Sequence, residues 1–409
     1  MTKKQKQKKC LVCEGSDLIM YLDLGNTALA NAFIKKTQLK DKEDKFPLRV
    51  LYCKTCHLVQ LDHIVDRKKV FSKYHYFSSA SSPLEKYYEQ YVKNLQKKFP
   101  NQTKGLIVEI GSNDGILLKY FKNKKTKTLG VDPAKNIAKL AISNGIETLP
   151  VFFNLDNAKK IVKKYKKASV VIANHVLAHT DDLHGVIKGV KELLDNDGVF
   201  VFEVQYLLDL IQKNEFDNTY HEHISYFSIA PLNTLLSKYG LKIFNIERVD
   251  AQGGSIRVYA GHTSDMFPVE KSIKNLIQAE KKNGLYNEKK YKIFGKKPEK
   301  IKKDLINLLK EIKKQNKTIV GYGASAKGNT LLQYIGIGPD ILDYIVDTTP
   351  SKQGKLTPGT HIPVYAQDRL KTHTPAYVLI LAWNYADIII KKESWLQKKG
   401  VIFITPIRK

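Results

Sequence analysis

Twice in this chain, an apolar run of strand length ends in a glycine turn that leads into a helix-like segment. Such strand–turn–helix units bury their apolar strands by lining up in a parallel sheet, so the pattern predicts an α/β fold with two sheets. A length of 409 residues agrees with two or three domains. The two units span residues 106–115 and 318–328, and further strand-like runs lie at 129–131, 169–173, 198–204, 241–247, 255–261, 342–346, 377–383 and 401–405.

The first glycine turn indicates a nucleoside ligand. Gly111 and Gly115 lack the G-x-G-x-x-G spacing of a dinucleotide site, and the surrounding polar residues suit S-adenosylmethionine (SAM), whose ammonium they can meet. Asp132 ends the next strand, where an acid can hydrogen-bond both ribose hydroxyls. The strand-like runs up to residue 261 predict one sheet around this site, the last two as a hairpin. We expect the cofactor at Glu109, Gly111, Asn113, Asp114, Gly115, Asp132 and Asn174.

All four cysteines lie near the start of the chain, as two C-x-x-C pairs 39 residues apart. Two such pairs can supply four thiolates to one tetrahedral zinc, and no cysteine is left over. Four protein ligands leave no open position, so the metal would hold a fold and not activate water. We expect structural Zn²⁺ on Cys10, Cys13, Cys53 and Cys56, with residues 14–52 packed as a small lobe of their own.

The formal net charge of +28 raises the question of a nucleic-acid partner. The chain holds 62 Lys but six Arg, and arginine is the usual residue for bidentate phosphate and base recognition. The lysines are spread along the chain and densest in helix-like stretches, which is typical of solvated helix faces. We therefore expect no nucleic-acid partner. There is no run of 18 apolar residues and no signal-peptide core, so we expect a cytoplasmic protein without a membrane partner.

One phenol, two imidazoles and one carboxylate fall within four residues, at Tyr220, His221, Glu222 and His223. The stretch follows the apolar run at 199–204 and precedes a helix-like segment, so we expect a loop at a strand's carboxyl end, where α/β folds place chemistry. Imidazole takes or gives a proton near neutral pH, and a neighbouring carboxylate can stabilise its charged form. The same pattern also fits a polar surface loop or two unrelated histidines, and these four residues alone do not decide between the two.

The second glycine turn places a hydroxyl and a lysine at the start of a helix. Backbone amides at a helix N-terminus can cradle phosphate, although tight turns need glycine as well. Polar residues again follow the later strands, where they would face a crevice at the edge of the sheet. We expect substrate contacts at Gly321, Gly323, Ser325, Lys327, Asp347 and Asn384.

With these motifs in one order, the sequence resembles the SAM-dependent C-methyltransferases that act on nucleotide-linked deoxysugars. The resemblance covers nearly the whole chain: both cysteine pairs and residues 74–82, 108–115, 177–179, 220–223, 321–327, 346–353, 356–359 and 382–384. It implies a zinc-binding lobe (1–72), a class I methyltransferase domain with a seven-stranded sheet (73–262), a helical connector (263–317) and a Rossmann-like domain that helps hold the nucleotide sugar (318–409).

The resemblance also implies roles for individual residues. In this family the residue matching His223 is the general base, and those matching Tyr220, Glu222, His179 and Tyr76 line the sugar pocket. Tyr74 is an alternative match for Tyr76, because the spacing there is ambiguous. Antibiotic-sugar members tend to carry Asp where this chain has His221, which leaves His221 as a second pocket group and the sugar undefined.

The implied chemistry is consistent with these residues, because a 4-keto group makes the proton on the neighbouring carbon removable. His223 would abstract that proton, with Glu222 stabilising the imidazolium. Tyr220, His179 or Tyr76 would donate hydrogen bonds to the enolate oxygen, and the enolate carbon would then attack the SAM methyl in line. Neither zinc nor a redox cofactor is needed for this step.

Three other hypotheses stay open. The net charge favours a zinc-containing RNA or DNA methyltransferase, which would need a basic stripe with base-stacking aromatic residues. The others are a non-enzymatic zinc-dependent scaffold with an inactive SAM fold, and an NAD-linked oxidoreductase that uses the second glycine turn. The sequence does not fix the nucleotide base, the methylated carbon, its stereochemistry or the oligomeric state, and we take the protein as a monomer.

Overall fold

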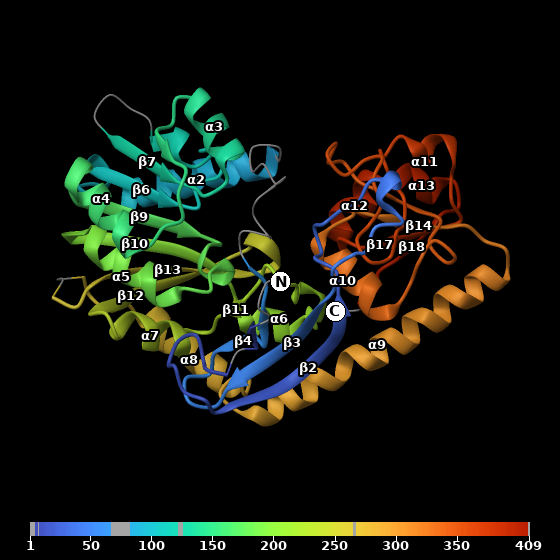
Figure 1. Cartoon of the computed structure of the whole chain (residues 1–409), viewed down its shortest axis with the longest axis horizontal. Helices are drawn as coiled ribbons and strands as arrows, with labels where there is room; N and C mark the ends of the chain where they lie inside the picture. The colour runs from blue at the N-terminus through green and yellow to red at the C-terminus, as the bar shows by residue number, and fades with distance from the viewer. Residues whose placement is uncertain (1–4, 7, 67–81, 122–125, 265–266, 408–409) are drawn as a thin grey trace.

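The computed structural model describes the chain except for residues 1–4, 7, 67–81, 122–125, 265–266 and 408–409. Figure 1 shows two sheets with their helices on opposite sides of the molecule, joined along the base by N-terminal strands and a long helix. The seven-stranded and five-stranded sheets thus lie to either side of a smaller N-terminal sheet. Among the described helices, none combines the length and hydropathy that crossing a membrane requires.

The larger sheet has the strand order β12-β13-β10-β9-β6-β7-β8. Its strands are β6 (Leu106–Ile110), β7 (Lys127–Val131), β8 (Thr148–Leu149), β9 (Ala168–Asn174), β10 (Leu194–Gln205), β12 (Leu241–Val249) and β13 (Ser255–His262). β13 runs antiparallel to both neighbours, and the other pairs are parallel. Residues 170–173 at its centre are fully buried, as expected where helices cover both faces of a parallel sheet. The predicted class I methyltransferase sheet and its hairpin are confirmed.

Two helices of this part, α4 (Leu155–Tyr165) and α5 (Leu183–Leu193), begin at polar caps. Asn154 and Asp182 accept hydrogen bonds from backbone N–H groups in the first turns of α4 and α5, which fixes where each helix starts. Because the strands β6 to β10 run parallel, their carboxyl ends and the loops that follow them lie at one edge of the sheet. The helices are α2 (Ser82–Lys98), α3 (Lys135–Ser143), α4 (Leu155–Tyr165), α5 (Leu183–Leu193), α6 (Leu207–Gln212) and α7 (Ile229–Ser237).

The five-stranded sheet has the order β16-β15-β14-β17-β18, with all pairs parallel. Its strands are β14 (Ile319–Tyr322), β15 (Tyr344–Val346), β16 (Val364–Tyr365), β17 (Tyr377–Ile380) and β18 (Ile402–Ile404), and its helices are α10 (Ala326–Ile335), α11 (Arg369–Thr372), α12 (Ala386–Lys392) and α13 (Ser394–Lys398). Because β15 and β17 lie on opposite sides of β14, the carboxyl end of β14 is a switch point, where such sheets bind ligands. Ser325 caps α10 at this point.

The sheet of the N-terminal region takes one strand from the central region. This sheet has the order β11-β4-β3-β2, with β2 (Leu18–Thr27), β3 (Phe46–Cys53) and β4 (Val59–Leu61). The fourth strand, β11 (Ser225–Tyr226), directly follows the Tyr220–His223 loop and pairs antiparallel with β4. A further short ribbon pairs β1 (Gln5–Lys6) with β5 (His63–Ile64). Since β11 uses the hydrogen-bonding edge of β4, it ties the loop to the zinc region.

Residues 263–317 contain two helices, α8 (Lys271–Lys282) and α9 (Glu288–Lys314), as their charged and periodic sequence predicts. Helix α9 packs against β2 and runs along the base of the molecule in Figure 1. Its Tyr291 stacks on Tyr52 of β3, with 4.2 Å between ring centroids. The helix therefore braces the zinc region from below. The domain boundaries at residues 72, 262 and 317 stay predictions.

Candidate active site

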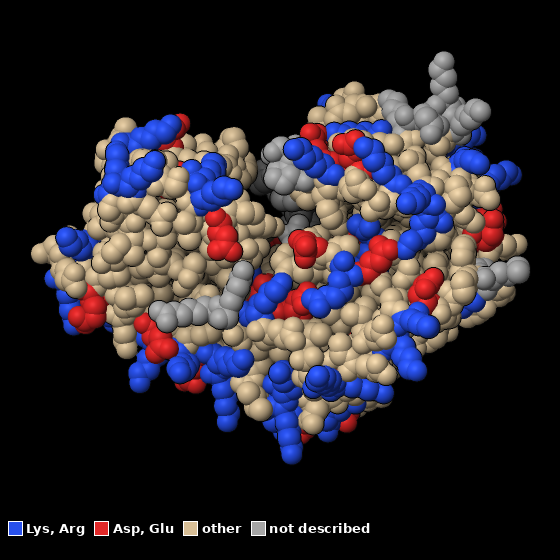
Figure 2. All heavy atoms as spheres, turned by 180° about the vertical axis from the view of Figure 1, so that it is seen from behind, with Lys and Arg blue, Asp and Glu red and all other residues tan. Residues whose placement is uncertain are grey.

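A cavity of about 770 Å³ lies where the carboxyl ends of the two larger sheets meet the N-terminal region. Figure 2, which views the molecule from behind, shows it hollowed between its two halves. The position agrees with the edge at which α/β folds bind ligands. Its lining includes Leu29, Asn31 and Phe33 from the N-terminal region, Glu109, Gly111, Asn113, Asp132, Asn174, His179, Asn218, Tyr220, Glu222 and His223 from the centre, and Ser325, Lys327, Lys352 and Asn384 from the C-terminal region.

The turn after β6 builds one end of the cavity, called here the cofactor end. Gly111 has φ +70°, and a Cβ atom there would lie 2.5 Å from Val176 Cγ2, so glycine is required. Glu109 and Asn174 each present a buried polar atom, Oε2 and Nδ2, that has no hydrogen-bond partner among the described residues. Burial raises the pKa of Glu109 well above its ordinary value. Unpaired buried polar atoms cost free energy, so both atoms mark places for ligand groups.

Asp132 directly follows β7, and the backbone holds its carboxylate. Oδ2 accepts from the Asn113 N–H at 3.0 Å, and Oδ1 accepts from the Ala134 N–H at 2.9 Å. Each oxygen keeps a second lone pair that can accept from a ligand hydroxyl. The predicted contact with the ribose is therefore compatible with these hydrogen bonds, and it stays a prediction. Asp114 and Gly115 do not line the cavity; Gly115 has φ +79° and lies against Ile146. These two residues shape the turn, and their expected contact with the cofactor stays a prediction.

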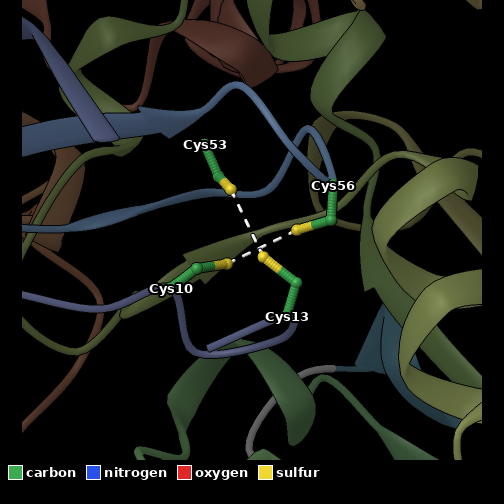
Figure 3. Close-up of side chains that lie close together, drawn as sticks. All are labelled: Cys10, Cys13, Cys53 and Cys56. Atoms are coloured by element: carbon green, nitrogen blue, oxygen red, sulfur yellow. Dashed lines mark hydrogen bonds between the residues drawn. The ribbon is translucent and has the colours of Figure 1, made fainter. Parts of the chain in front are cut away.

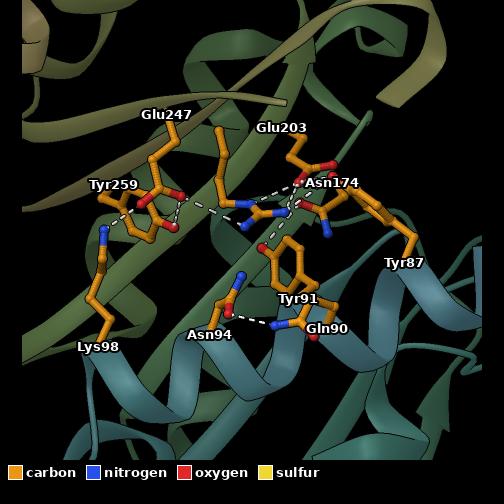
Figure 4. Close-up of polar contacts among 10 residues, drawn as sticks. Tyr87, Gln90, Tyr91, Asn94, Lys98, Asn174, Glu203, Glu247 and Tyr259 are labelled. Carbon is orange, nitrogen blue, oxygen red and sulfur yellow. Dashed lines mark hydrogen bonds and ion pairs between the residues drawn. The ribbon is translucent and has the colours of Figure 1, made fainter. Parts of the chain in front are cut away.

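A buried polar network holds the end of β9 in place (Figure 4). Glu203 on β10 is 0% exposed and accepts from the Tyr87 hydroxyl at 2.6 Å and from Arg257 Nε at 2.8 Å. Tyr91, which lies on α2 like Tyr87, donates to Asn174 Oδ1 at 3.3 Å. Because this contact occupies the amide oxygen, the Asn174 NH₂ group is the part left for a ligand.

The groups at the cofactor end fit SAM. The Glu109 carboxyl can accept a hydrogen bond from its ammonium, an amide N–H such as that of Asn174 can donate to its carboxylate, and Asp132 can accept from its ribose hydroxyls. Gly111 lets the backbone approach the ligand closely.

His223 lies at the other end of the cavity, called here the substrate end, and the backbone fixes its tautomer. Its Nδ1 is 3.0 Å from the Asn218 carbonyl oxygen, which can only accept, so Nδ1 carries the proton. Nε2 therefore has a lone pair and accepts from the Tyr220 hydroxyl at 2.7 Å. Burial lowers the pKa of His223 well below its ordinary value, so the ring is neutral near pH 7. Such a ring can take up a proton at Nε2.

His179 lines the cavity, but its neutral ring cannot be the hydrogen-bond donor expected from the sequence. Its Nδ1 donates to the Glu222 carbonyl oxygen at 2.7 Å, so its Nε2 carries no proton in the neutral ring. Burial lowers the pKa of His179 to about 4, which keeps the ring neutral. The expected hydrogen bond from His179 to an enolate oxygen is therefore wrong for this arrangement. Its ring lies edge-on to that of His223, 5.0 Å between centroids, and shapes the pocket.

The Glu222 carboxylate bonds to the N-terminal region. Asn31 Nδ2 donates to both carboxylate oxygens, at 2.8 and 3.0 Å. In the described part of the chain, no hydrogen bond or ion pair joins this carboxylate to His223, which corrects the expected stabilisation of the imidazolium. Burial raises the pKa of Glu222 to about 7, so the acid and its anion are both present near neutral pH.

His221 points out of the cavity and into the N-terminal region. It is 3% exposed, its Nε2 lies 3.3 Å from the Pro47 carbonyl oxygen, and its ring meets Phe46 edge-on. The expected second pocket group is therefore a buried packing residue. Tyr74 and Tyr76 lie outside the described residues, and their pocket role stays a prediction.

The residues expected to bind substrate at the second glycine turn fall into two groups. Ser325, Lys327 and Asn384 line the cavity, whereas Gly321, Gly323 and Asp347 do not. Asp347 instead holds the turn, because its two oxygens accept from the N–H groups of Ala324 and Thr349, each at 2.7 Å. Lys327 is 7% exposed, and its ammonium is paired with Glu215 at 3.2 Å.

The four cysteines converge in the N-terminal region (Figure 3). Their sulfur atoms lie within 4.8 Å of one another, with Cys10–Cys56 at 3.4 Å and Cys13–Cys53 at 3.6 Å. Thiolates about 2.3 Å from a tetrahedral zinc lie about 3.8 Å apart, so the donor set and the spacing both fit zinc. All four are free thiols in the structure.

Other cavity residues come from segments without a site pattern. Asn31 and Phe33 lie between the cysteine pairs, where nothing in the sequence marks them. Ser225 also lines the cavity, and its buried Oγ has no partner among the described residues. Lys352 also lines the cavity, and it lies within residues 346–353, one of the stretches that carry the family resemblance. That resemblance could have marked Lys352 as a site residue.

Sequence comparison decides the family. The C-methyltransferase NovU from Streptomyces niveus is 34% identical over 399 residues, which are 98% of this chain and 95% of that protein. This chain belongs to the same C-methyltransferase family. Family models match a zinc binding domain at residues 10–71, a methyltransferase domain at 84–246 and a C-methyltransferase C-terminal domain at 250–408. Together with the class I sheet, they identify a SAM-dependent methyltransferase that acts on carbon.

Shorter likenesses cover only part of this C-methyltransferase. The tRNA U34 carboxymethyltransferase from Campylobacter lari is 26% identical over 28% of this chain and 41% of that protein. A structure of magnesium protoporphyrin IX methyltransferase from Synechocystis PCC 6803 with bound SAM has 13% identity and a TM-score of 0.33, over 43% of this chain and 78% of that chain. At this identity and TM-score, the similarity to the second protein does not indicate a shared activity.

Proposed function

We propose that this C-methyltransferase methylates a carbon atom of a nucleotide-linked 4-keto-deoxysugar. The observation that carries the proposal is a single cavity that holds the cofactor turn at one end and a neutral, accepting imidazole at the other. Carbon becomes nucleophilic only after a proton is lost, and a ketone on the neighbouring carbon makes that proton removable. A base such as His223 is what this chemistry requires.

His223 acts as the general base. The C–H bond next to the ketone breaks, its proton goes to Nε2, and its electron pair forms an enolate whose charge rests on the former ketone oxygen. The Asn218 carbonyl keeps the Nδ1 proton in place and stabilises the imidazolium that forms. The Tyr220 hydroxyl, which donates to Nε2 before substrate enters, turns from the ring to the substrate oxygen. SAM, when bound, supplies the electrophilic methyl for the enolate carbon.

Glu222 acts as an acid towards the same oxygen. A buried carboxyl that stays protonated near neutral pH can donate a hydrogen bond to a developing oxyanion. Stabilisation of the charge that develops in the transition state is often the largest single contribution to catalysis. The raised pKa of Glu222, about 7, makes its acid form available. Asn31 then serves to hold the carboxyl group in place. Tyr76 keeps its proposed place in the sugar pocket.

The C-terminal side of the cavity takes the nucleotide part of the substrate. Ser325 and Asn384 offer polar groups there, and Lys352 and Lys355 add positive charge to the same lining. Lys352 Nζ donates to the Ala324 carbonyl oxygen at 2.8 Å, which places the ammonium beside the glycine turn. Lysine is a common phosphate ligand, so these two residues suit the diphosphate of a sugar nucleotide.

The cysteine cluster holds zinc in a structural role. Four thiolates leave the metal no open position, so the proposed chemistry does not pass through it. The proposal further takes the enzyme as a cytoplasmic monomer that acts on a small molecule, without a nucleic-acid or membrane partner. On the face in Figure 2, Lys and Arg are scattered among Asp and Glu and do not form a stripe along the hollow, which supports a small substrate.

The test is a panel of nucleotide 4-keto sugars incubated with SAM and analysed by mass spectrometry. We expect a mass gain of one methyl group on at least one member, together with S-adenosylhomocysteine. His223→Asn should slow the gain by about 10²–10⁴-fold, and the His221→Asn variant is the matched control from the same loop. Parallel arms with tRNA, and with NADH in place of SAM, test the nucleic-acid and oxidoreductase hypotheses. Methyl transfer to tRNA but to no sugar nucleotide would overturn the proposal.

A further inference from the structure

Lys327 is held in a buried cluster on the border between the two larger sheets. Its Nζ lies 3.2 Å from Glu215 Oε2 and 3.8 Å from Asp217 Oδ1, and it sits over the Trp383 ring at 4.0 Å from the centroid. All four side chains are less than 10% exposed. The ammonium is therefore already paired with protein carboxylates, which does not suit the phosphate contact expected from the sequence.

The cluster holds two carboxylates against one ammonium. Trp383 Nε1 donates to Asp217 Oδ2 at 2.6 Å, whereas Asp217 Oδ1 has no hydrogen-bond partner among the described residues and depends on Lys327 for compensation. A buried charge that loses its partner is strongly destabilising, because water cannot reach it. Lys327 is thus the cation that keeps the 215–217 segment in place.

This segment leads directly to the base. Glu215 and Asp217 precede Asn218, which closes the short helix η6 (Phe216–Asn218). Asn218 Nδ2 donates to Glu215 Oε2 at 2.5 Å, so the same carboxylate oxygen that pairs with Lys327 also holds Asn218. The Asn218 carbonyl then accepts the Nδ1 proton of His223. A continuous set of contacts therefore runs from Lys327 to His223.

We propose that Lys327 is a positioning residue that orients His223 through Glu215 and Asn218, and not a ligand of the substrate phosphates. The inference rests on the proposed function in assigning His223 as the base, but the contacts themselves do not depend on the substrate. By this route the C-terminal domain controls the base on the central domain. Loss of the ammonium should shift η6 and the Asn218 carbonyl, which would release the Nδ1 proton and let the ring change tautomer.

The kinetic test compares Lys327→Met, Glu215→Gln and the double variant. Lys327→Met leaves two carboxylates without a cation, and a displacement of about 1 Å at the base lowers kcat by about 10²-fold. We expect this fall with a near-normal KM for the sugar nucleotide. Adding Glu215→Gln to Lys327→Met removes one of the two negative charges and keeps a side-chain oxygen that can accept from Asn218. We therefore expect the double variant to recover much of the kcat that Lys327→Met loses. Lys313→Met, which removes the partly buried partner of Asp343, is the control.

A phosphate role predicts the opposite result. KM for the sugar nucleotide would then rise in Lys327→Met, and Glu215→Gln would not restore it, because the missing group would still be the phosphate ligand. That outcome would overturn the proposal. The double variant also carries the test if Lys327→Met alone does not fold, since raised KM in the double variant would be equally decisive.

A second readout does not require activity. In ¹⁵N-histidine-labelled protein, the His223 signal can be assigned by its absence in His223→Asn. We expect Nδ1 to be protonated in the wild type, a mixture of tautomers in Lys327→Met, and the wild-type state again in the double variant. An unchanged His223 signal in Lys327→Met would refute the positioning role even if no sugar nucleotide proves to be a substrate.

Discussion

The two ends of the cavity are built in different ways. The cofactor end comes from the central sheet alone: Glu109, Gly111 and Asp132 lie within 24 residues of one another along the chain, and Asn174 ends the neighbouring strand β9. The substrate end is assembled from three regions, since Glu222 bonds to Asn31, 191 residues away, and Asn218 is held by a carboxylate that pairs with Lys327.

This difference predicts that the two ends of the cavity respond differently to changes elsewhere in the molecule. A site made by a strand and the turn that follows it should survive damage elsewhere, because its backbone geometry is local. A site that depends on contacts between regions should fail when any of them loosens. In this enzyme, therefore, SAM binding and catalysis should be separable by changes outside the central sheet.

Loss of the zinc should have the largest effect: the substrate end should fail while the cofactor end still binds SAM. Cys53→Ser with Cys56→Ser should abolish zinc binding, and the N-terminal sheet should unfold with it, because zinc in such sites contributes about 10–16 kcal/mol to folding. Asn31 and the β4–β11 pairing would be lost. We expect no turnover but SAM affinity close to wild type, measured by metal analysis and calorimetry. Equal loss of SAM binding would show that the two ends do not behave independently.

His223→Asn should break the substrate end without disturbing the cofactor end. Removal of a general base typically lowers kcat by about 10²–10⁴-fold, and a group that acts in the transition state leaves KM near normal. Solvent deuterium exchange at the carbon next to the ketone should fall in parallel. His221→Asn is the control, because that ring is buried against Pro47 outside the cavity. If His221→Asn lost exchange while His223→Asn kept it, the base would be the other histidine.

Asp132→Ala should affect the cofactor end alone. A hydrogen bond to a charged group contributes about 1.5–3 kcal/mol, so we expect SAM affinity to fall by about 10–100-fold or more. The KM for the sugar nucleotide should change little. Asp114→Asn, a change on the same turn but outside the cavity lining, should have a far smaller effect on calorimetric SAM affinity. Comparable losses in both variants would indicate that the turn is being disrupted and that Asp132 does not contact the ribose.

Glu222→Gln should change the pH dependence more than the maximal rate. The raised pKa means that the acid form, which we propose as the donor, predominates below about 7 and is lost as the pH rises through that value. Wild-type kcat should therefore decline on the alkaline side of about pH 7. Glutamine keeps an N–H donor at every pH, so this decline should disappear from the kcat–pH profile of the variant. The same alkaline decline in Glu222→Gln would assign it to another group.

The sequence by itself determined the features that are local to the chain. Alternating apolar runs and glycine turns predicted both α/β sheets, since strand burial and positive φ at Gly111 depend on neighbours in sequence. The two C-x-x-C pairs identified the thiolate cluster, because this spacing already brings sulfurs together. The Tyr220–His223 stretch marked the substrate end.

The tertiary structure alone decided which partner each polar side chain takes. Nothing in the local pattern distinguishes His221 from His223, yet one packs under Pro47 and the other opens into the cavity. Likewise, Lys327 meets Glu215 and Glu222 meets Asn31 because strand pairing and domain packing bring those residues together. Hydrogen-bond partners depend on distances of a few tenths of an ångström and on burial from several sides, which a linear pattern of residue types does not contain.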